Sequence, residues 1–187
     1  MALQGAFIEH EQMLQRLGAE TFEVRQLNDW QQVKDGLILP GGESTTQAKL
    51  LNDLGLLEPI KADIQAGLPV FGTCAGLILL ANKIEGEPEK RFATMDIHVL
   101  RNAYGRQLGS FHTTGSVRGI ADDVPMTFIR APYIEQVTST ACQVLAEIDG
   151  HIVAARQGRQ LATAFHPELT KPVCDTRLHQ YFLSLCT

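Results

Sequence analysis

The sequence predicts an α/β fold with three layers, in which a mostly parallel, doubly wound sheet carries antiparallel additions. In the first half of the chain, apolar runs of strand length alternate with helical patterns and are joined by glycine-rich turns, as βαβ units require. In the second half, the pattern changes to short strands with hairpin-like breaks, which is typical of antiparallel pairing. The length of 187 residues predicts one domain covering residues 1–187.

The first half supplies the parallel part of the predicted sheet. A helix is expected over residues 9–17, because Met13, Leu14 and Leu17 fall on one helical face. The run 36–39 is continuously apolar and stops at Pro40, as expected of a parallel strand that is buried on both faces. The alternation continues with a strand over 21–24, a helix from about residue 45, a helix over 57–66, a strand over 68–71 and a helix over 75–81.

The second half supplies the antiparallel additions and a closing helix. Asp149-Gly150 lies between two strand-like runs and is a strong signal for a two-residue hairpin turn. A final helix is predicted over 175–185, with its apolar side chains turned inward. The strand-like runs are MDIHVL (95–100), GRQLGSFH (105–112), MTFIRA (126–131), QVLAEI (143–148), HIVAARQ (151–157) and LATAFH (161–166).

Composition excludes several classes of protein. The net charge is −5, from 16 basic and 21 acidic residues, so the chain lacks the charge of a general nucleic-acid binder. The longest uncharged apolar run, residues 75–81, is far shorter than the roughly 18 residues that span a bilayer, and no export leader opens the sequence. The cysteines form no CxxC pair, which predicts reduced thiols, no metal site and a cytoplasmic location. They are Cys74, Cys142, Cys174 and Cys186.

The sharpest chemical feature is Cys74 within Gly72-Thr73-Cys74-Ala75-Gly76, between a predicted strand and a predicted helix. This is the pattern of a nucleophile elbow, with sulfur in place of a hydroxyl. Glycines two residues away on either side remove the clashes that a Cβ would make in such a turn. The start of the following helix favours the reactive thiolate. Cys142 and Cys186 are interpreted instead as small buried hydrophobes.

A second feature is the segment Phe165-His166-Pro167-Glu168. In an extended chain His166 and Glu168 point the same way, while Pro167 keeps the segment out of a helix. A histidine base oriented by a carboxylate is what a cysteine nucleophile needs for acyl transfer. Taken alone, the motif is as compatible with a simple turn, but together with the elbow it predicts a Cys-His-Glu triad. The other histidines have no comparable setting and are expected to be structural or on the surface.

A third feature is the loop Pro40-Gly41-Gly42-Glu43-Ser44-Thr45-Thr46, which follows a predicted parallel strand. Ligands of open parallel sheets bind beyond the carboxyl ends of the strands. Glycines let backbone N–H groups approach a bound atom, so the loop suits an oxyanion or a phosphate. It lacks the lysine and the spacing of the common nucleotide-binding motifs, and a plain turn with a helix cap remains an alternative.

GTCAG, HPE and PGGEST in this chain resemble a class I (triad) glutamine amidotransferase, a family with a flavodoxin-like sheet. The segments ALQGAF, RNAYGRQ, FIRAP and AFHPELT resemble one branch of it, the glutaminase subunits of pyridoxal 5′-phosphate synthase (the PdxT family). The similarity runs from about residue 2 to 185. It implies hydrolysis of L-glutamine to L-glutamate and ammonia, no cofactor, and a synthase subunit as the partner that receives the ammonia for vitamin B6 synthesis.

The resemblance also assigns roles to residues. Cys74 would be the nucleophile, His166 the general base and then acid, and Glu168 the group that orients it. The N–H groups of Gly42 and Ala75 would form the oxyanion hole, which the elbow geometry suggests independently. The glutamine site would consist of Gly42, Glu43, Ser44, Arg101, Ile129 and Arg130. A carboxylate suits the ammonium of glutamine and an arginine suits its carboxylate.

Two positions depart from the pattern of the branch. Its members usually begin several residues earlier, so the first strand, before Leu3-Gln4-Gly5, is expected to be cut short here. His112 stands where an acidic residue is common, and no role is assigned to it. Alternative functions are a glutaminase subunit of another biosynthetic pathway, a non-catalytic regulatory subunit, and a cysteine hydrolase acting on γ-glutamyl peptides or other amides.

Overall fold

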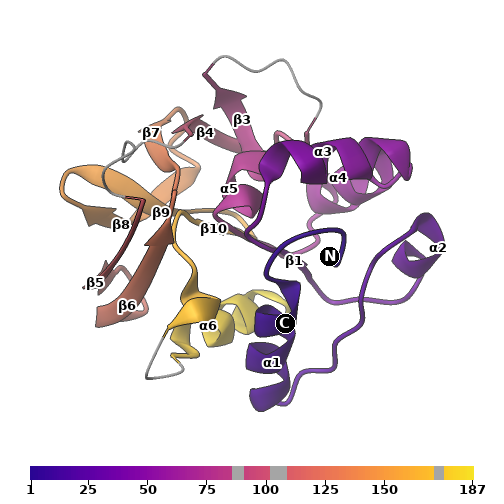
Figure 1. The fold of residues 1–187 in the computed structure, drawn as a ribbon, viewed down its shortest axis with the longest axis horizontal. Helices are drawn as coiled ribbons and strands as arrows, with labels where there is room; N and C mark the ends of the chain where they lie inside the picture. Colours follow the sequence, from indigo (N-terminus) through magenta and orange to yellow (C-terminus); the bar gives the residue numbers. More distant parts are fainter. Residues whose placement is uncertain (86–90, 102–108, 171–174) are drawn as a thin grey trace.

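The computed structural model describes residues 1–85, 91–101, 109–170 and 175–187. A mixed sheet forms the centre, with α3, α4 and α5 on one side and α1 and α6 on the other (Figure 1). The α/β class with three layers is therefore confirmed. The helices are α1 (Phe7–Arg16), α2 (Leu27–Trp30), α3 (Ser44–Asp53), α4 (Leu57–Gln65), α5 (Ala75–Leu80) and α6 (Arg177–Leu185), with a 3₁₀ turn, η1 (Pro167–Leu169).

The main sheet has the strand order β1-β2-β10-β9-β7-β4-β3, and β8 pairs with β9. Its parallel pairs are β1 with β2, β2 with β10, and β3 with β4, and the other pairs are antiparallel. Strands β5 and β6 form a separate antiparallel pair. The bounds are β1 (Leu37–Leu39), β2 (Val70–Thr73), β3 (Ala81–Ile84), β4 (Met95–Leu100), β5 (Ser110–Val117), β6 (Ala121–Ile129), β7 (Tyr133–Val137), β8 (Cys142–Ile148), β9 (His151–Gln157) and β10 (Gln160–Thr163).

The parallel trio β1, β2 and β10 determines where the chemically interesting segments meet. Every residue of β2 is buried, and α5, which packs against all three strands, is buried along its whole length. The three strands run in the same direction, so their carboxyl ends lie at one edge of the sheet. Pro40 follows β1, Cys74 follows β2, and His166 lies three residues beyond β10. The fold thus gathers all three sequence motifs at the edge where ligands of parallel sheets bind.

The structure confirms most of the predicted elements. The helices predicted from residue 45, over 57–66 and over 75–81 are α3, α4 and α5. The Asp149-Gly150 turn connects β8 to β9 with φ angles of 50° and 79°, as a primed hairpin turn requires. The predicted strand 68–71 is shifted to β2, since Pro69 has no N–H to donate to a ladder. The start of the predicted strand 105–112 lies outside the described residues, and β5 is described from Ser110.

The strand predicted over 21–24 is wrong. The structure assigns no strand to these residues, although their composition favours one. A strand needs a neighbouring strand that forms backbone hydrogen bonds along its length. Here the backbone hydrogen bond to another segment runs from the N–H of Ala2 to the carbonyl oxygen of Val24, at 2.9 Å, and it lies at the end of the predicted strand. The strand β7, for its part, was not predicted. It lies between β9 and β4, and its burial does not alternate regularly, so the sequence gives a weak period-two signal.

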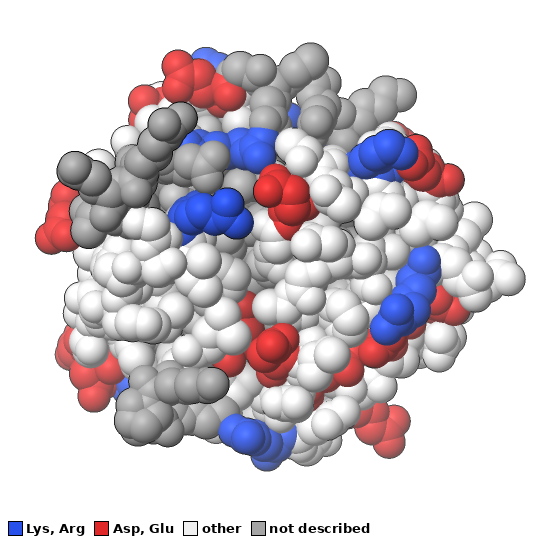
Figure 2. Space-filling model, in the orientation of Figure 1, with Lys and Arg blue, Asp and Glu red and all other residues white. Residues whose placement is uncertain are grey.

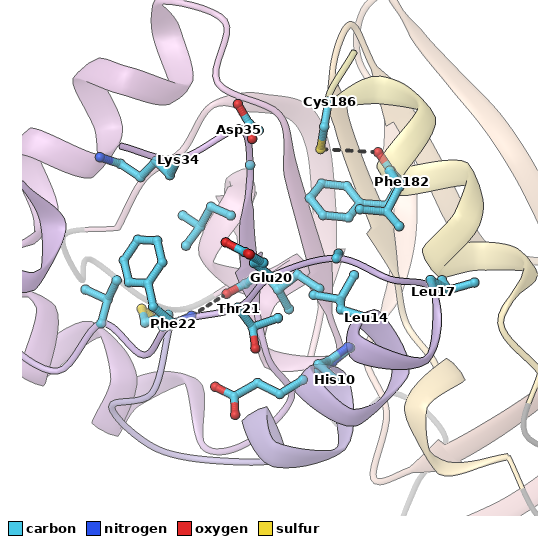
Figure 3. A pocket seen from close by; sticks show the side chains of 18 of the residues that line it. His10, Leu14, Leu17, Glu20, Thr21, Phe22, Lys34, Asp35, Phe182 and Cys186 are labelled. Atoms are coloured by element: carbon cyan, nitrogen blue, oxygen red, sulfur yellow. Dashed lines mark hydrogen bonds between the residues drawn. The ribbon is translucent and has the colours of Figure 1, made fainter. Parts of the chain in front are cut away.

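A cavity of about 830 Å³ lies beside β1, between α1, the segment 18–24 and the end of α6 (Figure 3). The structure assigns no strand to residues 1–6. The amino group of Met1 donates a hydrogen bond to the carbonyl oxygen of Ile38 at 2.9 Å. The first residue therefore lies beside β1, which is an edge strand of the sheet. His10 of α1 also lines this cavity, from the side that faces the sheet.

Candidate active site

Cys74 occupies a strained turn between β2 and α5. Its φ of 49° and ψ of −97° place it in a region that residues with a Cβ rarely adopt. Its N–H donates to the carbonyl oxygen of Thr163 at 2.8 Å, which ties the turn to the end of β10. A Cβ on Gly76 would lie 2.1 Å from the carbonyl oxygen of Leu39, and a Cβ on Gly72 would lie 2.7 Å from the backbone of Gly76. Both glycines are therefore required by packing.

His166 and Glu168 are joined by a short hydrogen bond. The Nδ1–H of His166 donates to Oε1 of Glu168 at 2.7 Å, and both residues are buried. His166 is extended, and Pro167 begins the 3₁₀ turn η1 directly after it, which sends Glu168 back toward the imidazole. The backbone N–H of His166 donates to the carbonyl oxygen of Thr127 at 2.8 Å, so β6 holds this segment in place. The predicted pairing of His166 with Glu168 is what the geometry shows.

The electrostatics of the pair favour a charged imidazolium. Burial alone would lower the pKa of His166, but hydrogen bonds with Cys74 and Glu168 outweigh it and raise the pKa to about 10. Burial would raise the pKa of Glu168, but the nearby His10 and the hydrogen bond from His166 lower it, so that this carboxyl group is ionised. The arrangement provides an imidazolium backed by a carboxylate, beside the loop that follows β1.

The Gly41-Gly42 loop lies against the imidazole. A Cβ on Gly41 would lie 2.2 Å from Cε1 of His166, so only glycine fits there. The N–H of Ala6 donates to the carbonyl oxygen of Gly41 at 3.0 Å, and the N–H of Glu43 donates to Oε1 of Gln4 at 2.8 Å. In a trans peptide the carbonyl and the next N–H point in opposite directions. The N–H of Gly42 therefore points away from Ala6, and segment 4–6 sets the orientation of this peptide.

The other predicted binding residues lie in three parts of the fold, namely the loop itself, the end of β4 and the end of β6. Arg101 donates to Oε1 of Glu43 at 3.3 Å, so two of them pair with each other. Ser44 begins α3, and its buried hydroxyl has no hydrogen-bond partner among the described residues. Ile129 and Arg130, both exposed, stand at the end of β6, the strand whose Thr127 holds the His166 segment. Arg130 has a φ of 42°, and its N–H donates to the carbonyl oxygen of Gly109 at 2.6 Å.

Sequence reasoning missed the role of two histidines behind the triad. His10 lies next to Glu168, and His179 contacts His10. His10 of α1 and His179 of α6 are both fully buried, and Nε2 of His10 lies 3.4 Å from Oε2 of Glu168. A signal for His10 was present, because it extends the inward-facing series of Met13, Leu14 and Leu17 at helical spacing. A histidine on the buried face of a helix needs polar partners in the core.

Of the two cysteines expected to be buried hydrophobes, Cys142 is buried, whereas Cys186 is only partly buried. Cys142 is buried, and burial together with the charge of Asp96 raises its pKa to about 11. Burial and the charge of Asp35 likewise raise the pKa of Cys186 to about 11, so neither thiol is ionised near neutral pH. Cys174 lies outside the described residues. Cys74, Cys142 and Cys186 are free thiols.

The wider surface and the remaining clusters point to no other centre. No group of three or more His, Cys, Asp or Glu side chains within the described ranges is arranged to hold a metal ion. On the face shown in Figure 2, acidic and basic side chains are interspersed. Within the part of the chain that the structure describes, no helix is long and apolar enough to cross a membrane.

Comparison with known proteins places the whole chain in one family. The model of the SNO glutamine amidotransferase family matches residues 1–187. A relative from Methanocorpusculum labreanum, named pyridoxal 5′-phosphate synthase subunit PdxT, is 58% identical over 99% of this chain and 95% of its own length. A relative of the same name from Streptococcus pneumoniae is 54% identical over 100% of this chain and 95% of its own length.

Solved structures agree with this placement. A crystal structure described as a glutamine amidotransferase is 43% identical and has a TM-score of 0.92, covering 100% of this chain and 96% of that one. A glutamine amidotransferase from Thermotoga maritima is 15% identical, with a TM-score of 0.59, covering 97% of this chain and 81% of that one. The second likeness concerns the fold alone.

Proposed function

Because the chain belongs to the SNO glutamine amidotransferase family, we propose that Cys74, His166 and Glu168 form the triad with which it hydrolyses glutamine. The chain is a glutaminase subunit of pyridoxal 5′-phosphate synthase, and its relatives at 53–58% identity are named pyridoxal 5′-phosphate synthase subunit PdxT. The observation that carries the triad is the 2.7 Å bond between His166 and Glu168, at the sheet edge where Cys74 follows the neighbouring strand β2.

The mechanism follows from the order of these contacts. The sulfur of Cys74 attacks the side-chain carboxamide carbon of glutamine and forms a C–S bond. His166 has taken the thiol proton and gives it to the departing nitrogen, so that ammonia leaves and a γ-glutamyl thioester remains. His166 then removes a proton from water, the water oxygen attacks the thioester, and glutamate and the free thiol are released. Glu168 stabilises the imidazolium in each half of the cycle.

The tetrahedral intermediates carry negative charge on the carboxamide oxygen. We assign its stabilisation to the backbone N–H groups of Gly42 and Ala75. Ala75 is the first residue of α5, directly after the nucleophile, where a helix leaves its N–H groups without partners inside the helix. Gly42 contributes from the loop that lies against His166, with its peptide oriented by the bond from Ala6 to Gly41.

The glutamine site comprises the loop and the neighbouring arginines. Glu43 accepts the substrate ammonium, and Arg101 and Arg130 donate to its carboxylate. Glu43 and Arg101 form an ion pair at 3.3 Å. When glutamine binds, this ion pair separates, and each side chain pairs with the oppositely charged group of the substrate instead. The buried hydroxyl of Ser44, which lacks a partner within the described residues, completes the site next to Gly42, and Ile129 supplies apolar contact.

Substrate recognition by charge leads to a prediction for binding. Glu43→Ala and Arg130→Ala are each expected to raise the KM for glutamine about tenfold to a hundredfold, because each removes a charge-assisted contact worth about 1.5–3 kcal/mol. The expected effect on kcat is smaller, since neither side chain touches the reacting bond. Steady-state ammonia release measures both constants. Glu58→Ala, on the exposed face of α4, is the control. Wild-type KM values in both variants would place the substrate's charged groups elsewhere.

The partner of the chain is the synthase subunit, and we propose that its docking activates the glutaminase. The exposed Gly5 has a φ of 101°, and a Cβ there would lie 1.9 Å from the carbonyl oxygen of Gly41. A partner that presses on segment 4–6 therefore acts directly on the peptide that carries the Gly42 donor. We place the exit of ammonia toward the partner at this surface, because the loop that it contacts lies against His166.

The activation proposal is tested by measuring ammonia release at saturating glutamine with and without the purified synthase subunit. The isolated chain is expected to be a poor glutaminase, and its kcat is expected to rise about a hundredfold or more on addition of the partner, in the range that one misplaced oxyanion donor costs. Gly5→Ala is expected to weaken the response, because the added Cβ displaces Gly41. Equal rates with and without the partner would leave the hydrolysis mechanism standing and remove the gating.

Two broader expectations belong to the same proposal. Residues 1–187 form one glutamine amidotransferase domain, supported by the pairing of β2 with β10, which brings the middle and the end of the chain together. The location is cytoplasmic, supported by the free thiols of Cys74, Cys142 and Cys186.

A further inference from the structure

We propose that His10 is a positioning residue of the triad, which holds the second carboxylate oxygen of Glu168 while His179 fixes the tautomer of His10. The inference rests on the proposed function, since it takes Glu168 as the member of the triad that orients His166. His10 and His179 lie behind the three reacting residues. They belong to the helices α1 and α6, on the face of the sheet away from α5 (Figure 1).

The contacts form a continuous chain of polar atoms inside the core. Nδ1 of His10 lies 2.9 Å from Nε2 of His179, and Nε2 of His10 lies 3.1 Å from Oγ1 of Thr73. The same Nε2 lies 3.4 Å from Oε2 of Glu168. His10 is 1% exposed and His179 is 0% exposed, so no bulk water competes for these atoms.

The carboxylate explains why a donor is needed at this place. Oε1 of Glu168 already accepts the hydrogen bond of His166, whereas Oε2 is buried and receives no hydrogen bond from the described residues. A buried carboxylate oxygen without a donor is costly. His10 Nε2 faces it at ion-pair distance, 3.4 Å, so a small rotation of the imidazole brings its N–H into full contact as the charge on His166 changes during the reaction.

The tautomers follow from the charge of Glu168. If Nε2 of His10 carried no hydrogen, its lone pair would face a carboxylate oxygen, which is repulsive. With hydrogen on Nε2, the N–H is shared between Thr73 and Glu168, and Nδ1 becomes an acceptor for the Nε2–H of His179. This leaves Nδ1 of His179 as a bare lone pair, and it is the ring nitrogen of His179 that lacks a partner among the described atoms. A missing donor there is better tolerated than a buried N–H without an acceptor.

The charges around the network agree with neutral imidazoles. Burial lowers the pKa of both His10 and His179, the latter to about 3, so neither is protonated near neutral pH. The groups that act on His10 are Glu168, His166, the Met1 amine and Glu9, and those that act on His179 are His10, Glu168 and Asp175. Glu168 thus has one imidazolium partner, His166, and one neutral N–H partner, His10.

The function of this second partner is to fix the carboxylate. A carboxylate with one donor can rotate and offer either oxygen to His166, whereas one with a donor on each side presents Oε1 alone. Held in this way, Glu168 keeps the imidazole turned toward Cys74 and stays ionised at lower pH. The simpler alternative is that His10 and His179 merely fill the core, in which case their replacement changes stability and leaves the chemistry alone.

Two amide substitutions at His10 separate these alternatives. The amide nitrogen of His10→Gln can occupy the place of Nε2 and donate to Glu168, whereas the shorter His10→Asn reaches only the place of Nδ1 and meets His179. The experiment compares both variants with the wild type in the complex with the synthase subunit, after thermal unfolding has shown that each is folded. His151→Asn, a partly exposed histidine at the start of β9, is the control.

For His10→Asn we expect kcat to fall about tenfold to a hundredfold, the range for a lost hydrogen bond to a charged group, with KM little changed. The acid limb of the pH profile is expected to move to higher pH, because Glu168 loses a donor that favours its ionised form. Alkylation of Cys74 by iodoacetamide in the isolated chain is expected to show the same shift. His10→Gln is expected to recover most of kcat and the original acid limb.

A core-filling role would give a different result. Equal kcat values and equal acid limbs in folded His10→Asn and His10→Gln would overturn the inference. If His10→Asn does not fold, His179→Asn and His179→Gln provide the same comparison one residue further out, and equal acid limbs in that pair would also overturn it. Cys74→Ala in the same assay separates this inference from the proposed function: turnover retained in Cys74→Ala refutes the triad itself, whatever His10 does.

Discussion

Replacing Cys74 with alanine is expected to abolish ammonia release from glutamine, with kcat falling by at least about 10⁴-fold. The triad acts as a unit, and removing the nucleophile removes the covalent route altogether. Alanine can occupy the same turn, because the φ of 49° strains any residue with a Cβ to a similar degree. The fold is therefore expected to persist, as thermal unfolding and binding to the synthase subunit will show. Cys74→Ser is expected to be inactive as well.

Labelling provides the second readout for the nucleophile. A glutamine analogue with an electrophilic side chain is expected to modify Cys74 and to spare the other three cysteines. Cys142 and Cys186 have pKa values raised to about 11, which leaves them protonated at neutral pH. Cys142→Ala, whose thiol lies in β8, is the matched control for activity. Modification spread evenly over all cysteines would contradict the assignment of Cys74.

The second large effect is expected at His166. His166→Ala should cost nearly as much activity as Cys74→Ala, because it removes both the proton acceptor for the thiol and the proton donor for ammonia. Glu168→Gln should cost less, about 10³-fold, since the amide oxygen still accepts the Nδ1–H of His166 but carries no charge. The comparison uses kcat of the complex at saturating glutamine.

The order of the two variants is the decisive part of this prediction. Glu168→Gln with a loss as large as His166→Ala would show that the carboxylate does more than orient and stabilise the imidazole. His166→Ala with most of its turnover retained would show that another group takes the proton, and the HPE segment would lose its role. His112→Asn, which changes a histidine that contacts Thr127 in β6, tests whether the loss is specific to His166.

The candidate triad could be predicted from the sequence because its signals are local. The Gly72 and Gly76 positions around Cys74 and the short spacing of His166 and Glu168 depend on the backbone within a few residues. Their meeting depends on parallel strands whose order the alternating pattern indicates. The chain signals α3, α4 and α5 in the same local way, through apolar spacing that runs over several turns.

The features that could not be predicted from the sequence depend on contacts between segments that are far apart in the chain. Residues 21–24 have strand composition but no ladder partner along their length, and composition says nothing about the neighbour. His10 and His179 are far apart in the sequence and meet only after α1 and α6 pack side by side in the core. The pairing of Glu43 with Arg101 also depends on tertiary placement, because each residue has several possible partners of opposite charge.

The pairing of β2 with β10 has a consequence for the biogenesis of the enzyme. Val70 lies opposite Gln160, and the N–H of Cys74 is held by Thr163, so the elbow is completed by residues that are synthesised long after Cys74 itself. Contacts between such distant segments form slowly, since a long loop must close first. A nascent or truncated chain therefore presents the thiol without its base. We therefore expect a chain that stops before β10 and the His166 segment to leave glutamine uncleaved, because the nucleophile then has neither its backbone anchor nor its base.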